Sequence, residues 1–439
     1  MTSAEQFLGI DLGTSSIKFC VIDLFGNLRR FCKIPLPESG YGLQEQQPQD
    51  LWKKAIDQGF SELRYTISLR SLQAISLDAT SGTIMLCNRQ GQVISDVLFY
   101  DDARATDQEM QWIAQSAPPS SVVHSRSSTL ARLLWLLNHP PMEKPVFCMH
   151  QADWLLHFLT GRTGLTDENN AFKLGYDAYQ RCWPKWLVNC LGSHAGLLPK
   201  VAPPGTRVAP LNKDLCQRHG LVTQPEVYTG TTDSIAAVMA SGIQQPGEAV
   251  TSLGSTLVLK VMSEKAINDA GTGVYSHRFG EFWLAGGASN SGGRVLSQYF
   301  DADDLKKLSE QIDTDRLTGL NYYPLPTTGE RFPINDPEKS PQISPRPDNP
   351  VRFLQALFEG MASIEAQGYR ILEKLGAPAI KRVVSVGGGA SNLAWTRIRE
   401  RFLAVPVEQA EHHEAAYGCA LLARKGWMNR HHPISESVD

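Results

Sequence analysis

The stretch Gly9-Ile10-Asp11-Leu12-Gly13-Thr14-Ser15-Ser16-Ile17-Lys18 lies between two apolar runs, one beginning at Phe7 and the other ending at Ile22. This pattern predicts two strands joined by a tight glycine turn. In the common phosphate-binding loops, by contrast, the glycines open a helix. The amides and hydroxyls of a strand-to-strand turn can bind an anion, and a carboxylate on the preceding strand can hold a cation beside it. The stretch therefore indicates chemistry on a nucleotide.

A second turn of the same kind lies in the other half of the chain. Leu253-Gly254-Ser255-Thr256 stands between apolar runs at 249–252 and 257–262, as Leu12-Gly13-Thr14-Ser15 does near the start. We interpret the two as copies of one duplicated α/β core. Ser252 stands where the first copy has Asp11. Two phosphate turns with a single carboxylate between them suit one nucleotide and one metal ion.

The rest of the chain alternates strand and helix patterns, which is typical of an α/β fold. Apolar runs predict strands at 72–77, 84–88 and 93–100, and helical periodicity predicts helices at 49–69, 102–115 and 129–138. The segment 322–350 is rich in Pro, Asp and Glu, and we expect it to be a surface excursion.

The composition is that of an ordinary globular protein. A formal net charge of −3 over 439 residues gives no electrostatic reason to expect nucleic acid or an anionic membrane as partner. No apolar run approaches the ~20 residues that cross a bilayer. The eight cysteines form no C-x-x-C pair, which is typical of a reducing compartment. We therefore expect a cytoplasmic protein, unless a presequence has been removed.

Two further turns rich in glycine and hydroxyl groups are Gly230-Thr231-Thr232-Asp233 and Gly387-Gly388-Gly389-Ala390-Ser391-Asn392. Each of the four turns, taken alone, is compatible with an ordinary tight turn. Asp233 precedes an apolar helix pattern, so it is either an N-terminal cap or a carboxylate positioned as a general base. Lys18 either neutralises phosphate or is a solvated surface residue. Asp102 is either a sugar ligand or part of a capped turn.

Taken together and in this order, the four turns resemble the FGGY family of carbohydrate kinases, within the superfamily of actin, hexokinase and heat-shock-chaperone ATPases. The resemblance covers Phe7 to about Gly426. It implies two duplicated ribonuclease-H-like (actin-like ATPase) domains with a cleft between them. The expected boundaries are 1–241 plus 414–439 for an N-terminal sugar-binding domain and 242–413 for a C-terminal nucleotide-binding domain.

The resemblance also implies roles for individual residues, with ATP and Mg²⁺ as cofactors. Asp233 would be the general base, and Asp11 would organise Mg²⁺ and face the sugar. The residues expected to bind ATP are Gly13, Thr14, Ser15, Lys18, Gly254, Ser255, Thr256, Gly387, Gly388 and Asn392, of which Thr14 is also assigned to catalysis. Those expected to line the sugar site beside the two aspartates are Thr80 and Ser81 in the Asp78 to Thr83 loop, Asp102 and Ser234.

Within the family, the chain is most similar to the short D-ribulose kinases of cyanobacteria and plants, through Thr229 to Lys260, Asp269 to His277 and Tyr322 to Pro326. Two departures from the family pattern concern the sugar. Arg132 stands where one signature has a lysine three residues before a tryptophan, and Tyr100 stands where larger sugar kinases often have a tryptophan.

We therefore expect ATP-dependent phosphorylation of a ketopentose, D-ribulose to D-ribulose 5-phosphate, with sugar and ATP as the partners. D-xylulose is an alternative substrate, because the two sugars differ in a single hydroxyl configuration. A non-catalytic sugar or nucleotide sensor on the same fold is the other alternative, although both Asp11 and Asp233 are retained. The oligomeric state, the pathway and the regulation are not readable from the sequence.

Overall fold

The computed structural model describes residues 5–37, 47–119 and 121–432. Parts of the predicted domains that fall on 1–4, 38–46, 120 and 433–439 lie outside the described residues. The chain forms two compact units, which we call unit 1 (1–240 and 414–439) and unit 2 (241–413). Across the described ranges, no helix combines the length and the apolar character needed to cross a membrane.

The central sheet of unit 1 has the strand order β3-β2-β1-β4-β10-β9, and β11 also pairs with β4. Its first three strands form an antiparallel meander that includes the two strands predicted around the glycine turn, and β4 runs parallel to β1. Strand β1 is buried on both faces, as expected at the centre of a covered sheet. The strands are β1 (Gln6–Leu12), β2 (Ser16–Asp23), β3 (Leu28–Pro35), β4 (Leu72–Ala79), β9 (Arg207–Pro210), β10 (Glu226–Tyr228) and β11 (Thr231–Thr232).

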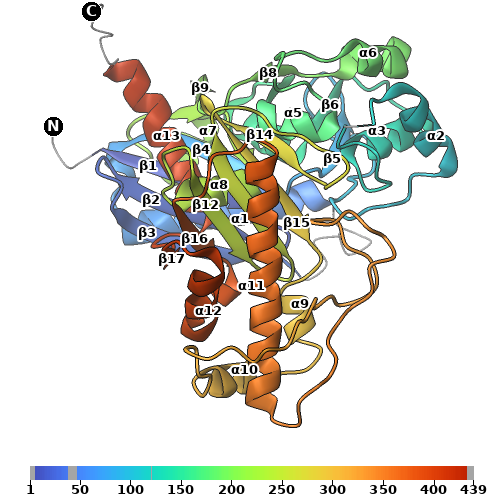
Figure 1. The fold of residues 1–439 in the computed structure, drawn as a ribbon. Helices are drawn as coiled ribbons and strands as arrows, with labels where there is room; N and C mark the ends of the chain where they lie inside the picture. Colours follow the sequence, from blue (N-terminus) through green and yellow to red (C-terminus); the bar gives the residue numbers. More distant parts are fainter. Residues whose placement is uncertain (1–4, 38–46, 120, 433–439) are drawn as a thin grey trace, which may run out of the picture. The chain divides into compact units, whose positions relative to one another are not determined.

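Helix α13 (Ala415–His431) packs on β1, β2 and β4 of this sheet (Figure 1). A Cβ on Gly9 of β1 would lie 1.8 Å from the carbonyl oxygen of Ala416, and one on Gly418 would lie 1.9 Å from that of Ala236 in α8 (Asp233–Ala240). No side chain fits in these spaces, so only glycine permits both approaches. The two glycines let α13 lie directly against the sheet and against α8.

Some of the helices of unit 1 were predicted, but α4, α5, α6 and α7 were not. Helix α3 matches the prediction for 129–138, and α1 matches that for 49–69 to within a few residues. The remaining elements are α1 (Pro48–Thr66), η1 (Leu69–Ser71), β5 (Ile84–Cys87), α2 (Asp107–Ser116), α3 (Thr129–Asn138), β6 (Phe147–His150), α4 (Gln151–Thr160), β7 (Leu165–Asp167), α5 (Glu168–Leu174), α6 (Lys185–Leu191), η2 (Gly192–Leu197), β8 (Lys200–Ala202) and α7 (Lys213–His219).

Two predictions between 93 and 115 are wrong. The segment 93–100 lies along β5 on the side opposite β6, but it makes only isolated bridges at Val93 and Leu98. Between them, the Ser95 hydroxyl rather than a backbone carbonyl accepts from the Leu86 amide, which interrupts the ladder. The helix predicted from residue 102 begins only at Asp107, because Thr106 caps it. The Thr106 hydroxyl accepts a hydrogen bond from the amide of Gln108, and the Glu109 carboxylate accepts one from the amide of Thr106. This reciprocal capping box sets the start of the helix.

The sheet of unit 2 repeats the topology of unit 1, with the order β14-β15-β13-β12-β16-β17. Strand β12 is antiparallel to β13 and parallel to β16, as β1 is to β2 and β4. The duplication predicted from two short turns is therefore present in the strand pairing. The elements are β12 (Glu248–Leu253), β13 (Leu257–Ser263), β14 (Tyr275–Phe279), β15 (Phe282–Ser289), α9 (Gly293–Leu296), α10 (Ala302–Ser309), α11 (Pro350–Lys374), β16 (Arg382–Val386), η3 (Gly388–Ser391), α12 (Leu393–Leu403) and β17 (Val407–Gln409).

The segment 322–350 is only in part the surface excursion that its composition predicts: 334–350 is exposed or half-buried, but several residues of 322–333 are buried. Tyr322 and Phe332 belong to the hydrophobic core of unit 2. Glu330 is also buried, and it accepts hydrogen bonds from the Ser289 hydroxyl at 2.6 Å and the Asn290 amide at 2.7 Å. A few apolar side chains spaced among prolines and charges are enough to anchor the segment.

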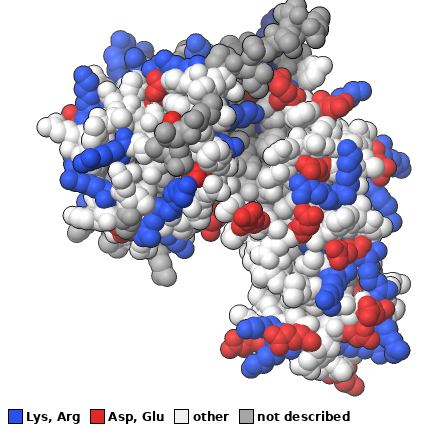
Figure 2. Space-filling view, turned by 90° about the vertical axis from the view of Figure 1, so that its left-hand side faces the viewer, with Lys and Arg blue, Asp and Glu red and all other residues white. Residues whose placement is uncertain are grey.

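Most charged side chains are exposed, and both signs are interspersed on the face shown in Figure 2. One ion pair of unit 2 is instead completely buried. Arg399 of α12 donates to both carboxylate oxygens of Glu365 in α11, at 2.6 and 2.7 Å, and to the Ser385 hydroxyl in β16. Glu365 also accepts from the Thr251 hydroxyl in β12. The network ties two helices to two neighbouring strands.

We predict that Arg399→Met lowers the free energy of unfolding of unit 2 by about 3–5 kcal/mol, because it leaves the Glu365 charge buried without a partner. Adding Glu365→Leu should recover part of the loss, since no unpaired charge then remains. Urea denaturation of the full chain measures both effects. Lys53→Ala, which removes the exposed pair with Asp50, is the control and should cost less than about 1 kcal/mol. An equally small loss for Arg399→Met would contradict the prediction.

Candidate active site

Two aspartates face each other where β1 and β4 end. The parallel register places Asp11 opposite Asp78, and the two side chains are only 5% and 0% exposed. Asp78 Oδ1 accepts no hydrogen bond from a neutral or cationic donor, and the two aspartate side chains are close enough to share a proton. The sequence prediction assigned a role to Asp11 but treated Asp78 only as the start of a loop. The missed signal was an aspartate that closes an apolar strand, as Asp11 itself does.

The surroundings raise the pKa of both carboxyls. Burial raises the pKa of Asp11, although the neighbouring Lys18 charge opposes the shift. Burial raises the pKa of Asp78 well above its usual range, and the negative charges of Asp11 and Asp233 add to this effect. Two buried carboxyls in contact hold a proton or a cation between them more readily than two negative charges.

Lys18 of β2 is the cation next to these carboxyls. Its Nζ lies 3.3 Å from Asp11 Oδ2 and 2.7 Å from Glu414 Oε2. Burial by itself would lower the pKa of Lys18, but the charge of Asp11 and the hydrogen bond with Glu414 outweigh burial and raise it. The alternative of a solvated surface lysine is therefore wrong, and a role toward phosphate stays a prediction.

Helix α13 contributes two residues that the sequence reasoning did not assign. The Cys419 thiol donates to Asp78 Oδ2 at 3.0 Å, and Glu414, the partner of Lys18, is the residue that precedes the helix. Burial raises the pKa of Cys419 well above its usual range, so the side chain is a neutral thiol. The segment 414–420 resembles the C-terminal helix of the family, but the contacts of these two residues with Asp78 and Lys18 arise only through the packing of α13. We call Asp11, Asp78, Asp233, Lys18, Glu414 and Cys419 the carboxylate cluster.

Asp233 opens α8 directly after β11, and β11 pairs with β4 so that Thr231 lies opposite Asp78. The half-buried Asp233 accepts a hydrogen bond from the amide of Ser234 at 2.7 Å, and Ser234 itself is exposed. Its charge helps to raise the pKa of Asp78. Asp233 therefore lies within electrostatic reach of the other aspartates while contacting the first amide of its helix. Its role as a base stays a prediction.

The turn between β1 and β2 is closed by hydrogen bonds from the Gly13 amide to Ser16 O at 3.0 Å and from the Leu36 amide to Ser15 O at 2.8 Å. The side chains of Thr14 and Ser15 are exposed. The closed turn holds these two hydroxyl groups on the surface of unit 1, where a ligand can reach them.

The residues predicted to line the sugar site have different surroundings. The Thr80 amide and hydroxyl both donate to Leu12 O, at 3.1 and 3.4 Å, which ties the loop after β4 to β1. Ser81 Oγ is buried without a partner. Asp102 accepts from the amide and from Nε of Arg104, at 3.1 and 2.9 Å. Asp102 therefore closes a short turn but does not cap α2, which begins after Thr106, and its role toward the sugar stays a prediction.

In unit 2, the structure brings two predicted nucleotide turns together. Gly387 has a φ of 87°, and a Cβ there would lie 3.3 Å from the amide nitrogen of Gly254. Ser255 and Gly388 are exposed, and Thr256 is half-buried. The Asn392 side chain caps α12 by accepting from the Trp395 amide at 3.0 Å, and it donates to Ser309 Oγ at 2.8 Å. Asn392 therefore has a structural role, whatever it contributes to a ligand.

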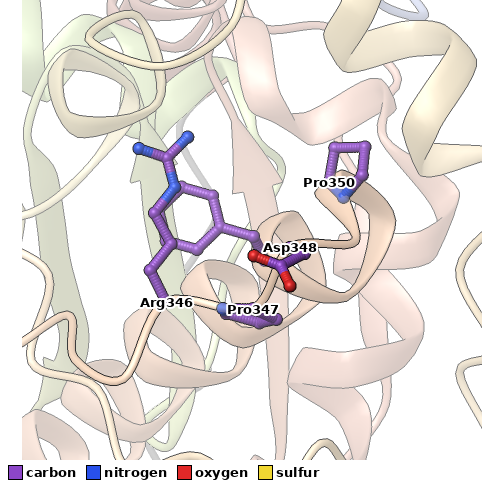
Figure 3. A pocket seen from close by; sticks show the side chains of 5 residues that line it. Arg346, Pro347, Asp348 and Pro350 are labelled. Atoms are coloured by element: carbon purple, nitrogen blue, oxygen red, sulfur yellow. The ribbon is translucent and has the colours of Figure 1, made fainter.

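Two cavities of the described residues lie away from the predicted sites. A cavity of about 280 Å³ in unit 2 is formed where Arg346 packs over the Phe353 ring at the start of α11, beside Pro347, Asp348 and Pro350 (Figure 3). A cavity of about 400 Å³ in unit 1 is mostly apolar. Neither is lined by a predicted site residue, so the carboxylate cluster is the candidate active site.

The carboxylate cluster fits Mg²⁺. Within the ranges that the structure describes, no group of three or more His, Cys, Asp or Glu side chains is arranged to hold a metal ion. Mg²⁺ needs fewer, because it usually keeps several waters and is held by one or two carboxylates together with substrate phosphates. Asp11 and Asp78 Oδ1 offer hard oxygen donors of that kind.

Comparison with known proteins identifies the family of this chain. Residues 6–240 match the N-terminal domain of the FGGY family of carbohydrate kinases, and residues 249–427 match its C-terminal domain. The chain belongs to the FGGY family of carbohydrate kinases. Because the C-terminal match runs to residue 427, it includes α13, although this helix packs in unit 1.

Individual relatives of this FGGY kinase are distant. A xylulose kinase of Bacillus subtilis is 24% identical over 97% of this chain and 89% of its own length. An autoinducer-2 kinase of Yersinia enterocolitica is 26% identical over 97% of this chain and 87% of its own. The crystal structure of a "xyloylose kinase" from Brucella ovis has the same fold, with a TM-score of 0.85 at 22% identity over 97% of this chain and 91% of that one. None of the three is named a ribulose kinase, so they do not support the expected closer likeness to D-ribulose kinases.

Another buried aspartate of this FGGY kinase supports the strand that leads to Asp233. Asp167 Oδ1 accepts from the amides of Asn169 and Asn170 at 2.9 and 3.0 Å, and Oδ2 accepts from the Asn170 side chain. The Asn169 side chain in turn donates to Thr231 Oγ1 in β11 at 3.0 Å. Burial raises the pKa of Asp167 to about 6, although the hydrogen bonds from Asn170 oppose the shift.

We predict a pH-dependent difference in stability between the wild type and Asp167→Asn. The folded pKa of about 6 exceeds the ordinary value of 3.8, so the folded state binds this proton more tightly than the unfolded state does. The contribution is fully present below the ordinary pKa and is lost as the pH rises through about 6. Urea denaturation at several pH values measures the free energy of unfolding of both proteins. The value for the variant minus the value for the wild type should rise by about 2 kcal/mol from about pH 4.5 to about pH 7.5. Parallel pH profiles for the two proteins would contradict the prediction.

Proposed function

We propose that this FGGY kinase transfers the γ-phosphoryl group of ATP to the terminal hydroxyl of a ketopentose. The observation that carries the proposal is the carboxylate cluster. In this cluster the negative charges of Asp11 and Asp233 raise the pKa of Asp78, and Lys18 forms an ion pair with Asp11. Phosphoryl transfer needs an acceptor hydroxyl that is oriented and relieved of its proton, with charge stabilised around the phosphoryl group. In our proposal Asp233 accepts that proton.

The remaining groups bind and orient ATP. When bound, Mg²⁺ supplies charge neutralisation on the phosphates. Asp11 is its proposed ligand or the residue that orders its waters, and Asp78 supports Asp11. In unit 1 we assign phosphate binding to Gly13, Thr14, Ser15 and Lys18. In unit 2 we assign phosphate binding to Gly254, Ser255 and Thr256, and contacts with the adenosine part to Gly387, Gly388 and Asn392.

We favour D-xylulose as the ketopentose, because the Bacillus subtilis relative, which matches 97% of this chain, is named a xylulose kinase. D-ribulose is the second candidate, supported by the sequence likeness of 229–260, 269–277 and 322–326 to short D-ribulose kinases. The two sugars differ at one hydroxyl configuration, so small changes in the sugar site would be enough to exchange one preference for the other.

The proposal is tested by ADP release from ATP and Mg²⁺ with a panel of pentuloses, hexuloses and polyols. We expect the highest kcat/KM with D-xylulose, followed by D-ribulose. A higher kcat/KM with D-ribulose would reverse our choice of substrate without affecting the proposed reaction. If no ketopentose stimulates ADP release, the chain is not a ketopentose kinase, and a non-catalytic sensor on the same fold becomes the better account.

We predict that Asp233→Asn lowers kcat by about 10²–10⁴-fold, because asparagine still caps a helix but does not accept a proton. The thermal midpoint should change little. Asp214→Asn is the matched control, since Asp214 lies exposed in the first turn of α7 and should tolerate the same change with full activity. Near-native turnover by the Asp233 variant would leave this residue only its structural role.

A further inference from the structure

Four neutral side chains near the carboxyl end of β4 each bury a polar atom that has no hydrogen-bond partner. The atoms are Thr83 Oγ1, Gln151 Oε1, Asn169 Oδ1 and Thr232 Oγ1. Each of the four side chains is at most 2% exposed. We call these residues the polar cluster. None of them was assigned a role from the sequence, and none belongs to the carboxylate cluster.

The four residues come from separate segments that the backbone brings together. Thr83 ends the turn that follows β4, and its carbonyl accepts from the amide of Gln151 at 3.1 Å. Thr232 of β11 is paired with Ala79, the last residue of β4. The Asn169 side chain donates to Thr231 Oγ1, next to Thr232 along the chain. Three of the residues are thus linked to β4 or its turn directly, and Asn169 is linked through β11.

The ends of helices α4 and α5 complete this arrangement. Gln151 and Asn169 lie in the first turns of α4 and α5. Helix α4 packs against β4 and against β7, and the last residue of β7, Asp167, caps α5, which packs against β11. The backbone segments that carry the polar cluster therefore lie near the strand ends that carry Asp78 and Asp233.

An unpartnered buried polar atom costs about 1–3 kcal/mol, so native proteins rarely keep several in one place without a use for them. Gln151 and Asn169 present amide carbonyl oxygens, which only accept hydrogen bonds, while the two threonine hydroxyls both donate and accept. Carbonyl oxygens repel a phosphate anion and suit a hydroxyl donor. A polyhydroxylated, uncharged ligand matches this set of groups.

We propose that the polar cluster binds the hydroxyl groups of the sugar, with the Gln151 and Asn169 carbonyl oxygens accepting hydrogen bonds from them. The inference rests on the proposed function and extends it to the residues that select the substrate. It adds two residues, Gln151 and Asn169, that lie far along the chain from the predicted sugar-site residues Thr80 and Ser81. In the free protein the unpartnered atoms lower the stability, and in the complex they hydrogen-bond to the sugar.

The proposal predicts opposite effects of one substitution on stability and on sugar binding. Gln151→Met removes the unpartnered oxygen at nearly constant volume and leaves the backbone bond to Thr83 in place. We expect the thermal midpoint of the free protein to rise by about 2–4 °C. The dissociation constant and the KM for the ketopentose should rise by about 3–10-fold, as expected for one lost hydrogen bond, while the KM for ATP stays unchanged. A purely structural glutamine would not produce this combination.

Gln355→Met is the matched control. Gln355 is also buried, but its amide donates to the carbonyls of Asp313 and Arg316 and to Glu359. We expect this variant to lose thermal stability and to keep the sugar KM. Thr232→Val, which removes a second unpartnered atom without changing the shape, should behave like Gln151→Met and serves if that variant does not fold.

Direct titration of the sugar, alongside kinetics with D-xylulose and D-ribulose, separates the two proposals. If the wild-type protein binds and phosphorylates a ketopentose but Gln151→Met and Thr232→Val bind it equally well, the inference is wrong and the proposed function stands. A parallel rise in the KM values for ATP and sugar would also overturn the inference, because it would indicate a general disturbance of the site. If the wild-type protein neither binds nor phosphorylates any ketopentose, the proposed function falls and this inference falls with it.

Discussion

The candidate active site depends on the parallel pairing of β1 with β4. This register sets Asp11 opposite Asp78, and it does so where both side chains are buried and charge is costly. The antiparallel pairing of β2 with β1 then places Lys18 opposite Asp11, and the pairing of β11 with β4 places Thr231 opposite Asp78, two residues before Asp233. A shift of one residue in the register of β4 would turn Asp78 to the other face of the sheet and remove it from the carboxylate cluster.

Helix α13 connects the packing of unit 1 with the chemistry of its strand ends. Gly9 and Gly418 let the helix approach the sheet and α8 more closely than any side chain would allow. That approach places Cys419 against Asp78 and brings Glu414 to Lys18. Any change that lifts the helix from the sheet would therefore alter the charges around Asp11 as well as the core.

Features that depend on neighbouring residues were predicted well. The glycine turn at 13–15, its copy at 254–256, the strands around both turns and the helix that begins at Asp233 all follow from local periodicity and turn chemistry. The errors arose where side-chain contacts override the local pattern. The segment 93–100 has a strand pattern, but the Ser95 hydroxyl accepts from the Leu86 amide and interrupts its pairing with β5. The polar composition of 322–350 hid the few side chains that enter the core, such as Phe332.

The sequence by itself determined the duplicated α/β class, the phosphate-type turns and the family, because each of these is indicated by motifs of neighbouring residues. Tertiary structure alone decided which carboxylates meet. Strand register sets Asp78 beside Asp11. Cys419 and Glu414, near the end of the chain, contact Asp78 and Lys18. Two separate helices position Gln151 beside the turn after β4 and Asn169 beside β11. Whether a polar group is buried, and whether it finds a partner there, is set by residues remote in sequence. That is why no local pattern predicted these contacts.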